Sequence, residues 1–327
     1  MINFIKENYQ GILISLLVGI GAHFLAPDIP GVNGVILAFL VAVLIGNSIT
    51  IPSSCKKGIN YASGTLLEYA IIFLAFSITF KDIAVLGFSK FAFVLGIVLV
   101  SLLATIFLAK KFNSKDSTAW LVGFGTAICG SSAIAALAPV VSERKEDAGI
   151  AIAVVNLLGS VGMIILPFTL QLLFTESSQI GFLLGATLQS VGNVAGAGYG
   201  LSQEIGDTAL TVKLARVALL TPAVIFFSLL VNKGKKDAQG KKIKFTLPYY
   251  LWIFVAITIA NSLITLPENV LEKLQLIGTL LLTVSMAAIG LKVSFQTLWQ
   301  SGKMAIGFGL VIFLIQIAVS LALISVG

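Results

Sequence analysis

The feature that most constrains this chain is a succession of apolar stretches separated by short polar segments. A helix of about 20 apolar residues crosses the hydrocarbon core of a bilayer, which is about 30 Å thick. The stretches predict an all-α membrane protein with about eleven transmembrane helices. The expected spans are Gln10–Leu25, Val32–Ile49, Gly58–Phe80, Phe88–Leu108, Thr118–Val141, Asp147–Phe174, Ile180–Gly200, Asp207–Val231, Pro248–Ile264, Leu271–Gly290 and Gly302–Ser325.

Composition supports this interpretation. Charged residues make up 11% of the 327 residues and hydrophobic residues 57%, whereas a soluble domain carries about 25% charged residues. So few charges do not cover a surface in water, so we expect the lipid bilayer to cover much of it. The net charge of +7 comes from residues between the apolar runs, which favours orientation in a membrane over binding to nucleic acid.

The basic residues are distributed unequally between the two sides of the predicted bundle. Fourteen of the 21 Lys and Arg residues fall on the side of the N-terminus and five on the other, while Lys213 and Arg216 lie within a span. The positive-inside rule then predicts a cytoplasmic N-terminus. Eleven spans carry the C-terminus to the outside, within one polytopic domain over residues 1–327. The polar stretch at about 232–246 becomes a cytoplasmic linker.

Two internal similarities suggest repeats. In the first, Phe76–Lys81 resembles Ala287–Lys292, which pairs spans in inverted orientation, as in many secondary transporters. In the second, four residues recur in the same order and at the same spacing: Gly125, Ala135, Ser142 and Asp147 match Gly185, Ala195, Ser202 and Asp207. The second similarity pairs spans that run parallel by our count. One inverted repeat does not explain both, and we expect the inverted repeat.

The fifth span contains a candidate break. Glycines and small hydroxyl residues stand in mid-span at Thr126, Cys129, Gly130, Ser131 and Ser132. Glycine lets the backbone leave the helix, and freed polar groups are tolerated at membrane depth where they line a cavity. A half-helix that begins there offers N–H donors to an anion. The alternative is close helix packing through small residues.

The seventh span is also polar and glycine-rich. Gln189, Ser190 and Asn193 lie there, and Gln189 and Asn193 share a helix face. Buried amides either bind a substrate or join two helices. Asn156 in the sixth span corresponds to Arg216 in the second similarity, so we place it in the same cavity.

Lys213 and Arg216 stand three residues apart on one face of the eighth span. Each charge at mid-helix costs roughly 2.5–3.5 kcal/mol on insertion scales, so a counter-charge is expected. Glu68 in the third span is one protein partner and an anionic ligand is another. The alternative for Lys213 is that its side chain reaches the membrane interface.

Motifs of soluble enzymes are missing. The sequence has no His-Glu-x-x-His zinc motif, no phosphate-binding loop and no pair of intramembrane aspartates. With one histidine and two cysteines, a zinc site is improbable. We expect no catalytic residues, no cofactor and no metal.

Four motifs carry a family resemblance: Ile128–Ala133, Ile78–Phe80, Lys213 with Arg216, and Ala288–Leu291. With these, the chain resembles the YeiH-like family of bacterial membrane proteins, commonly labelled sulfate exporters. That family is similar to bile-acid symporters and cation/proton antiporters. The resemblance implies a core subdomain with crossing broken helices that moves against a panel subdomain, in the bacterial cytoplasmic membrane.

The chain departs from the family pattern at two places. Glu68 and Ser77 stand where the family usually has arginines, and Gln189 and Ser190 stand where it often has a His-Glu pair. The first change weakens the case for a doubly charged substrate, and the second weakens proton coupling at that point. Lys213 and Arg216 keep an anionic substrate plausible.

The leading expectation is a secondary transporter that moves a small anion of the sulfate, sulfonate or carboxylate class by alternating access. The substrate would contact Thr126, Cys129, Gly130, Ser131, Ser132, Asn156, Gln189, Ser190, Asn193, Lys213 and Arg216. Glu68 is the candidate for coupling to Na⁺ or H⁺. A cation antiporter and a membrane receptor without transport stay open as alternatives, as does a homodimer.

Overall fold

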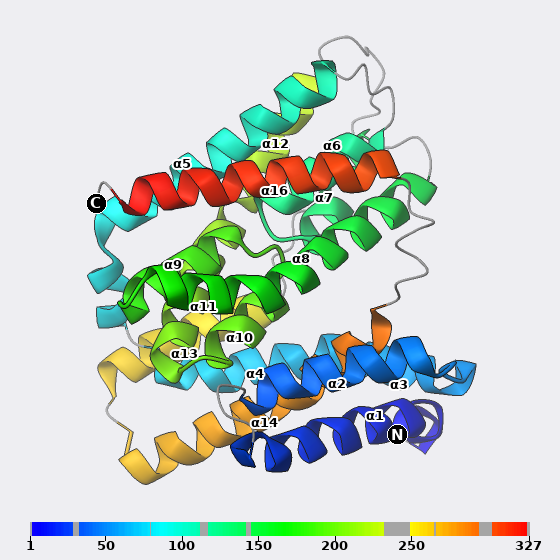
Figure 1. The fold of residues 1–327 in the computed structure, drawn as a ribbon. Helices are drawn as coiled ribbons and strands as arrows, with labels where there is room; N and C mark the ends of the chain where they lie inside the picture. The colour runs from blue at the N-terminus through cyan, green and yellow to red at the C-terminus, as the bar shows by residue number, and fades with distance from the viewer. Residues whose placement is uncertain are drawn as a thin grey trace. The chain divides into compact units, whose positions relative to one another are not determined.

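The computed structural model describes residues 2–28, 33–78, 80–111, 117–141, 145–231, 249–264, 266–293 and 303–325, and the regular structure in these ranges is helical (Figure 1). The prediction of an all-α membrane protein is confirmed. Six described helical stretches are long and apolar enough to cross a membrane, and two shorter apolar helices accompany them. Eleven crossings, the inverted repeat and the core and panel subdomains stay predictions. The linker predicted at about 232–246 lies outside the described residues.

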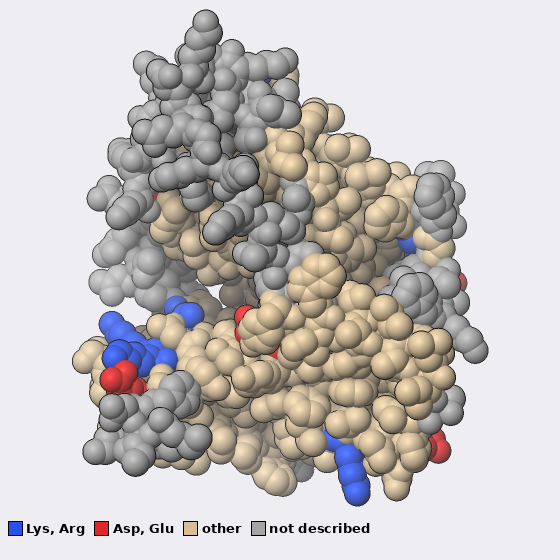
Figure 2. All heavy atoms as spheres, turned by 180° about the vertical axis from the view of Figure 1, so that it is seen from behind, with Lys and Arg blue, Asp and Glu red and all other residues tan. Residues whose placement is uncertain are grey.

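The chain divides into two compact units, which are described separately. Unit 1 comprises residues 1–85, 195–208 and 248–295, and unit 2 comprises residues 86–194, 209–247 and 296–327. Three of the six long apolar stretches belong to each unit. Figure 2 shows atoms other than those of acidic and basic residues over most of the described surface on that face, as expected of a chain that lipid surrounds.

Unit 1 contains helices along its first segment and in its third segment. They are α1 (Ile2–Leu25), η1 (Ala26–Asp28), α2 (Gly34–Ser48), α3 (Ser53–Tyr61), the π-helical turn η2 (Ala62–Leu66), α4 (Leu67–Leu74), η3 (Ala75–Ser77), α13 (Tyr249–Leu263) and α14 (Glu268–Lys292). The third span was predicted to begin at Gly58. It begins at Ser53 because the amphipathic first turns bury Cys55.

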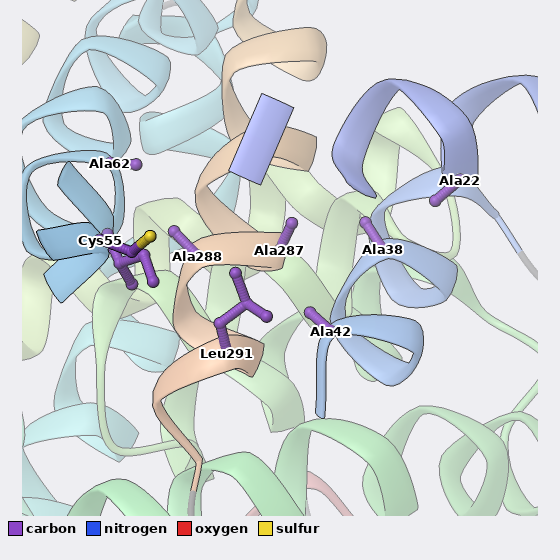
Figure 3. Close-up of a cluster of buried hydrophobic side chains, with 9 residues drawn as sticks. Ala22, Ala38, Ala42, Cys55, Ala62, Ala287, Ala288 and Leu291 are labelled. Atoms are coloured by element: carbon purple, nitrogen blue, oxygen red, sulfur yellow. The ribbon is translucent and has the colours of Figure 1, made fainter. Parts of the chain in front are cut away.

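Small residues let the helices of unit 1 approach closely. Ala38 and Ala42 of α2 face Ala287 of α14 in a buried cluster, and Ala288 faces Cys55 of α3 (Figure 3). A Cβ on Gly11 of α1 would overlap the Cys55 carbonyl oxygen of α3. In lipid, where apolar surface gives no preference for other helices, such close contact is a main source of helix association.

Unit 2 combines long helices with several short ones. Its elements are most of α5 (Phe80–Lys111), with α6 (Ser117–Ala127), α7 (Ser131–Val141), α8 (Lys145–Leu173), α9 (Ser177–Thr187), α12 (Leu220–Val231) and α16 (Lys303–Ile324). Two further helices, α10 (Val191–Tyr199) and α11 (Gln203–Ala218), have residues in both units. Helix α8 packs against α6 and α16.

Candidate functional site

The predicted break in the fifth span is present. Helix α6 ends at Ala127, α7 begins at Ser131, and Gly130 between them has φ 74°. This left-handed conformation favours glycine, since a Cβ would be strained there. A second break separates α9 from α10 at residues 188–190, where Leu188 is extended. The two breaks occupy corresponding positions in the second similarity, which therefore has a structural counterpart.

The two breaks lie against each other. A Cβ on Gly130 would stand 3.5 Å from the Gln189 carbonyl oxygen and 3.7 Å from the Ser190 Cα. These are ordinary van der Waals distances, so the backbone conformation of Gly130 is what calls for glycine. Because α6 and α9 both end here, their last carbonyl oxygens lack intrahelical partners at one place in unit 2.

Lys213 and Arg216 of α11 donate to those carbonyl oxygens. The Lys213 Nζ donates to Ile128 at 2.7 Å, to Leu188 at 2.9 Å and also to Gln189. The Arg216 guanidinium donates through one terminal nitrogen to Gly185 at 3.0 Å and Leu188 at 2.9 Å. Its other terminal nitrogen donates to Thr126 at 3.1 Å and Ala127 at 2.9 Å.

Both cations are fully buried, each with 0% of its surface exposed. The alternative that Lys213 extends to the membrane interface is therefore wrong. Three carbonyl oxygens match the three hydrogens of an ammonium group, and a guanidinium keeps its proton in proteins. Both side chains thus hold a positive charge against neutral backbone groups.

The expected counter-charge from Glu68 is not found among the described residues. Glu68 lies in unit 1 and accepts a hydrogen bond from the Tyr249 hydroxyl at 2.7 Å. The expectation went wrong because sequence composition shows side-chain charges and does not show which backbone carbonyls a helix break leaves without partners.

The residues next to the breaks have very different access to solvent. Thr126 and Cys129 are buried, Ser131 and Ser190 are half-buried, and Ser132 is exposed. Asn156 on α8 is also exposed. The Ser190 hydroxyl accepts from the Asn193 N–H at 3.0 Å and caps α10.

Gln189 is a buried polar side chain that lacks hydrogen bonds at both ends of its amide. It is fully buried, and neither its amide oxygen nor its amide nitrogen has a partner among the described residues. A Cβ on Gly159 of α8 would stand 3.2 Å from this oxygen and would overlap the Asn193 amide. Unpaired buried amides are costly, so this group is available to a ligand or a water molecule.

The structure brings together most of the predicted site residues. Thr126, Cys129, Gly130, Gln189, Ser190, Asn193, Lys213 and Arg216 lie at or beside the two breaks, with Ser131 and Ser132 at the start of α7. Gln316 of α16 was missed. It is fully buried and donates to the Ala186 carbonyl at 2.8 Å. A lone glutamine in an apolar span was the available signal.

A group in unit 1 was also missed. One oxygen of Asp207 accepts from the hydroxyls of Ser77 at 2.6 Å and Tyr199 at 2.7 Å, and from the Gln203 amide at 3.2 Å. Ser77 belongs to η3, while Tyr199 and Asp207 belong to α10 and α11. Their spacing in sequence gave no indication of this contact.

Comparison with known proteins gives similarities over most of the chain. Residues 10–309 match the family described as Conserved hypothetical protein 698. A UPF0324 membrane protein of Lactiplantibacillus plantarum is 31% identical over 98% of both chains. The UPF0324 inner membrane protein YeiH of Escherichia coli K12 is 32% identical over 86% of this chain and 82% of its own. No solved structure matches.

Proposed function

Because the chain belongs to the UPF0324 family of membrane proteins, we propose that it is a secondary transporter of a small anion in the bacterial cytoplasmic membrane. The observation that carries the proposal is the pair of buried cations at the helix breaks, whose partners are neutral carbonyl groups. We place the anion beside these breaks in unit 2 and assign it to the sulfate, sulfonate or carboxylate class.

The charge balance at the breaks supports an anion. A helix C-terminus carries about −0.5 elementary charge, so α6 and α9 together offset about one of the two positive charges. Among the described residues no acidic side chain forms an ion pair with Lys213 or Arg216. A positive excess in a medium of low dielectric constant attracts a small anion more strongly than it would in water.

The exposed side of the breaks supplies suitable donors. Ser131 and Ser132 begin α7, whose first N–H groups have no intrahelical acceptor. Helix N-termini bind anions through such groups. In the proposal, the anion is oriented by the hydroxyls of Ser131, Ser132 and Ser190 and by the Asn156 amide. The buried Lys213 and Arg216 provide the positive charge.

Alternating access is the mechanism that we infer for this site. Irregular backbone at membrane depth recurs in secondary transporters, whose binding sites lie between broken helices. In the proposal, movement of the helices around the breaks exposes the anion to either side of the membrane in turn. The distribution of basic residues supports a cytoplasmic N-terminus and an external C-terminus.

Counterflow in proteoliposomes tests the proposal. Vesicles loaded with unlabelled sulfate, ethanesulfonate or acetate should accumulate the labelled anion transiently, and the rate should saturate. Ser132→Ala should slow the flux by about threefold to tenfold because one hydrogen bond to a charged group is lost. Ser325→Ala, at the exposed end of α16, is the matched control and should leave the flux unchanged.

Other results would favour the alternatives. Binding without flux under any gradient would support a receptor. A flux that requires Na⁺ or a pH gradient, moves no anion and disappears in Glu68→Gln would support a cation antiporter. Either result would refute the anion transporter.

A further inference from the structure

Four of the six tyrosines of the chain gather around Glu68 in unit 1. The Tyr249 hydroxyl donates to the Glu68 carboxylate at 2.7 Å. The Tyr61 and Tyr69 hydroxyls lie near enough that a phenolate on either would repel one on Tyr249. The Tyr250 ring packs edge-on against Tyr249, with ring centroids 6.3 Å apart. Tyrosine is otherwise scarce, since only Tyr9 and Tyr199 lie elsewhere.

The π-helical turn η2 aligns two of these tyrosines. Tyr61 precedes η2 and Tyr69 follows it in α4, eight residues later. In a regular α-helix with 3.6 residues per turn, residues eight apart lie roughly 80° apart around the axis. A π-turn holds more residues per turn and removes most of this difference. Consistent with that, the two hydroxyls lie near enough that a phenolate on Tyr69 would repel one on Tyr61.

The cluster is accessible at its edge. The side chains of Tyr69 and Tyr249 are 40% and 49% exposed, and Glu68 is half-buried. Among the described residues no Lys or Arg forms an ion pair with Glu68. The nearby Lys292 ammonium donates to Ser63 in η2 at 3.1 Å. Glu68 therefore presents its negative charge beside the Tyr249 hydroxyl, with the phenol groups of Tyr61 and Tyr69 nearby.

We propose that Glu68 with Tyr61, Tyr69 and Tyr249 forms a binding site for an organic ammonium ion. The carboxylate supplies the opposite charge, and the faces of the tyrosine rings attract the cation, as in aromatic cages for alkylated amines. The tyrosine oxygens accept hydrogen bonds from any N–H groups. One carboxylate offers too few oxygens for a divalent metal ion, and the described residues hold no metal-binding group of acids, cysteines and histidine.

The ammonium group has two sources with the same chemistry. It belongs either to a free amine in solution or to the headgroup of an amine-bearing phospholipid, since the cluster lies on a helix of membrane-spanning length. The site is distinct from the breaks in unit 2 and does not rest on the proposed anion transport. Failure of one proposal therefore leaves the other intact.

Thermal unfolding of the purified full chain in detergent tests the site. Methylammonium and tetramethylammonium chlorides are compared with sodium chloride at equal ionic strength. A ligand that binds the native state raises its apparent stability, so both organic ions should raise the Tm more than sodium does. Equal shifts with all three salts would refute the proposal.

Variants separate the contributions to binding. Glu68→Gln should weaken binding of both organic ions at least tenfold, and Tyr249→Leu should weaken it about twofold to fivefold. Tyr249→Phe keeps the ring, so tetramethylammonium binding should persist. The controls are Glu272→Gln and Tyr9→Leu, because Glu272 is an exposed acid and Tyr9 is 49% exposed, like Tyr249.

The outcomes are unambiguous. An unchanged shift in Glu68→Gln, or in Tyr249→Leu should Glu68→Gln fail to fold, would overturn the proposal. Repeating the titration in nanodiscs of phosphatidylethanolamine or phosphatidylglycerol distinguishes the sources. If the ethanolamine lipid suppresses the methylammonium shift, the lipid headgroup occupies the site, and if it does not, the free amine does.

Discussion

Two acids of unit 1 and two cations of unit 2 are satisfied in opposite ways. In unit 1 the acids Glu68 and Asp207 accept hydrogen bonds from hydroxyl groups of Tyr249, Ser77 and Tyr199. In unit 2 the cations Lys213 and Arg216 donate to backbone carbonyls at two helix breaks. Side-chain hydroxyls therefore donate to these two acids, and backbone carbonyls accept from these two cations.

The difference follows from what an intact helix offers. A carboxylate needs donors, and serine and tyrosine provide them without disturbing the helix that carries them. A buried cation needs acceptors, and in an intact helix nearly all carbonyl oxygens are already occupied. The breaks in unit 2 free those oxygens. We infer that the breaks and the cations stabilise each other, so that neither is expected to persist alone.

The largest effect is expected from Arg216→Met, which keeps an unbranched side chain and removes four hydrogen bonds. The carbonyls of Gly185, Thr126 and Ala127 would remain buried without this donor, while Leu188 keeps Lys213, and each unsatisfied group costs about 1–3 kcal/mol. We expect a loss of more than about 3 kcal/mol in the free energy of unfolding. Denaturant unfolding in detergent measures it, and a loss below about 1 kcal/mol would break the comparison.

Lys213→Met should have the next largest effect, about 2–3 kcal/mol, because the Ile128 and Gln189 carbonyls lose their donor while Leu188 keeps Arg216. The control is Lys57→Met. Lys57 forms an exposed ion pair with Glu7 at 2.8 Å, and such pairs contribute about 1 kcal/mol or less. Equal losses in the two variants would show that burial among carbonyls has no special role.

Gly11→Ala tests the packing of unit 1. The new Cβ would overlap backbone atoms of α3, which do not yield as a flexible side chain does. We expect a loss of about 1–3 kcal/mol from overpacking. Gly21→Ala in the same helix is the matched control, because nothing lies within 4 Å of its new Cβ. A thermal shift of the same size in both would contradict the close contact.

Ser77→Ala should have the smallest effect. Asp207 would lose one of its donors and keep those of Tyr199 and Gln203. The expected loss in the free energy of unfolding is about 1 kcal/mol. Ser77→Thr, which retains the hydroxyl, should restore most of it, and a failure to do so would assign the loss to packing instead.

The sequence predicted the elements better than the contacts. Gly130 and its small neighbours indicated the break in the fifth span, because no straight helix needs them there. Lys213 and Arg216 stood out as charges within a span, and the sequence offered Glu68 or an anionic ligand as their partner but not the backbone carbonyls. Carbonyl oxygens become free acceptors only where a helix is interrupted, so no residue type in the sequence indicates them.

Long separations in the chain explain the other misses. Tyr249 meets Glu68 across 181 residues, and Asp207 meets Ser77 across 130. Helix periodicity relates residues within a few turns and says nothing about such pairs. In contrast, the second similarity was visible in the sequence, and it returns in the corresponding ends of α6 and α9.

Equilibrium binding of sulfate and ethanesulfonate to the purified protein tests the central claim, that the breaks of unit 2 hold a positive excess for an anion. The wild type should bind at least one of them, and Arg216→Lys, which keeps the charge, should retain binding within about tenfold. Arg216→Gln, confirmed as folded by circular dichroism, should bind neither to a measurable degree. Unchanged affinity in folded Arg216→Gln would contradict the account.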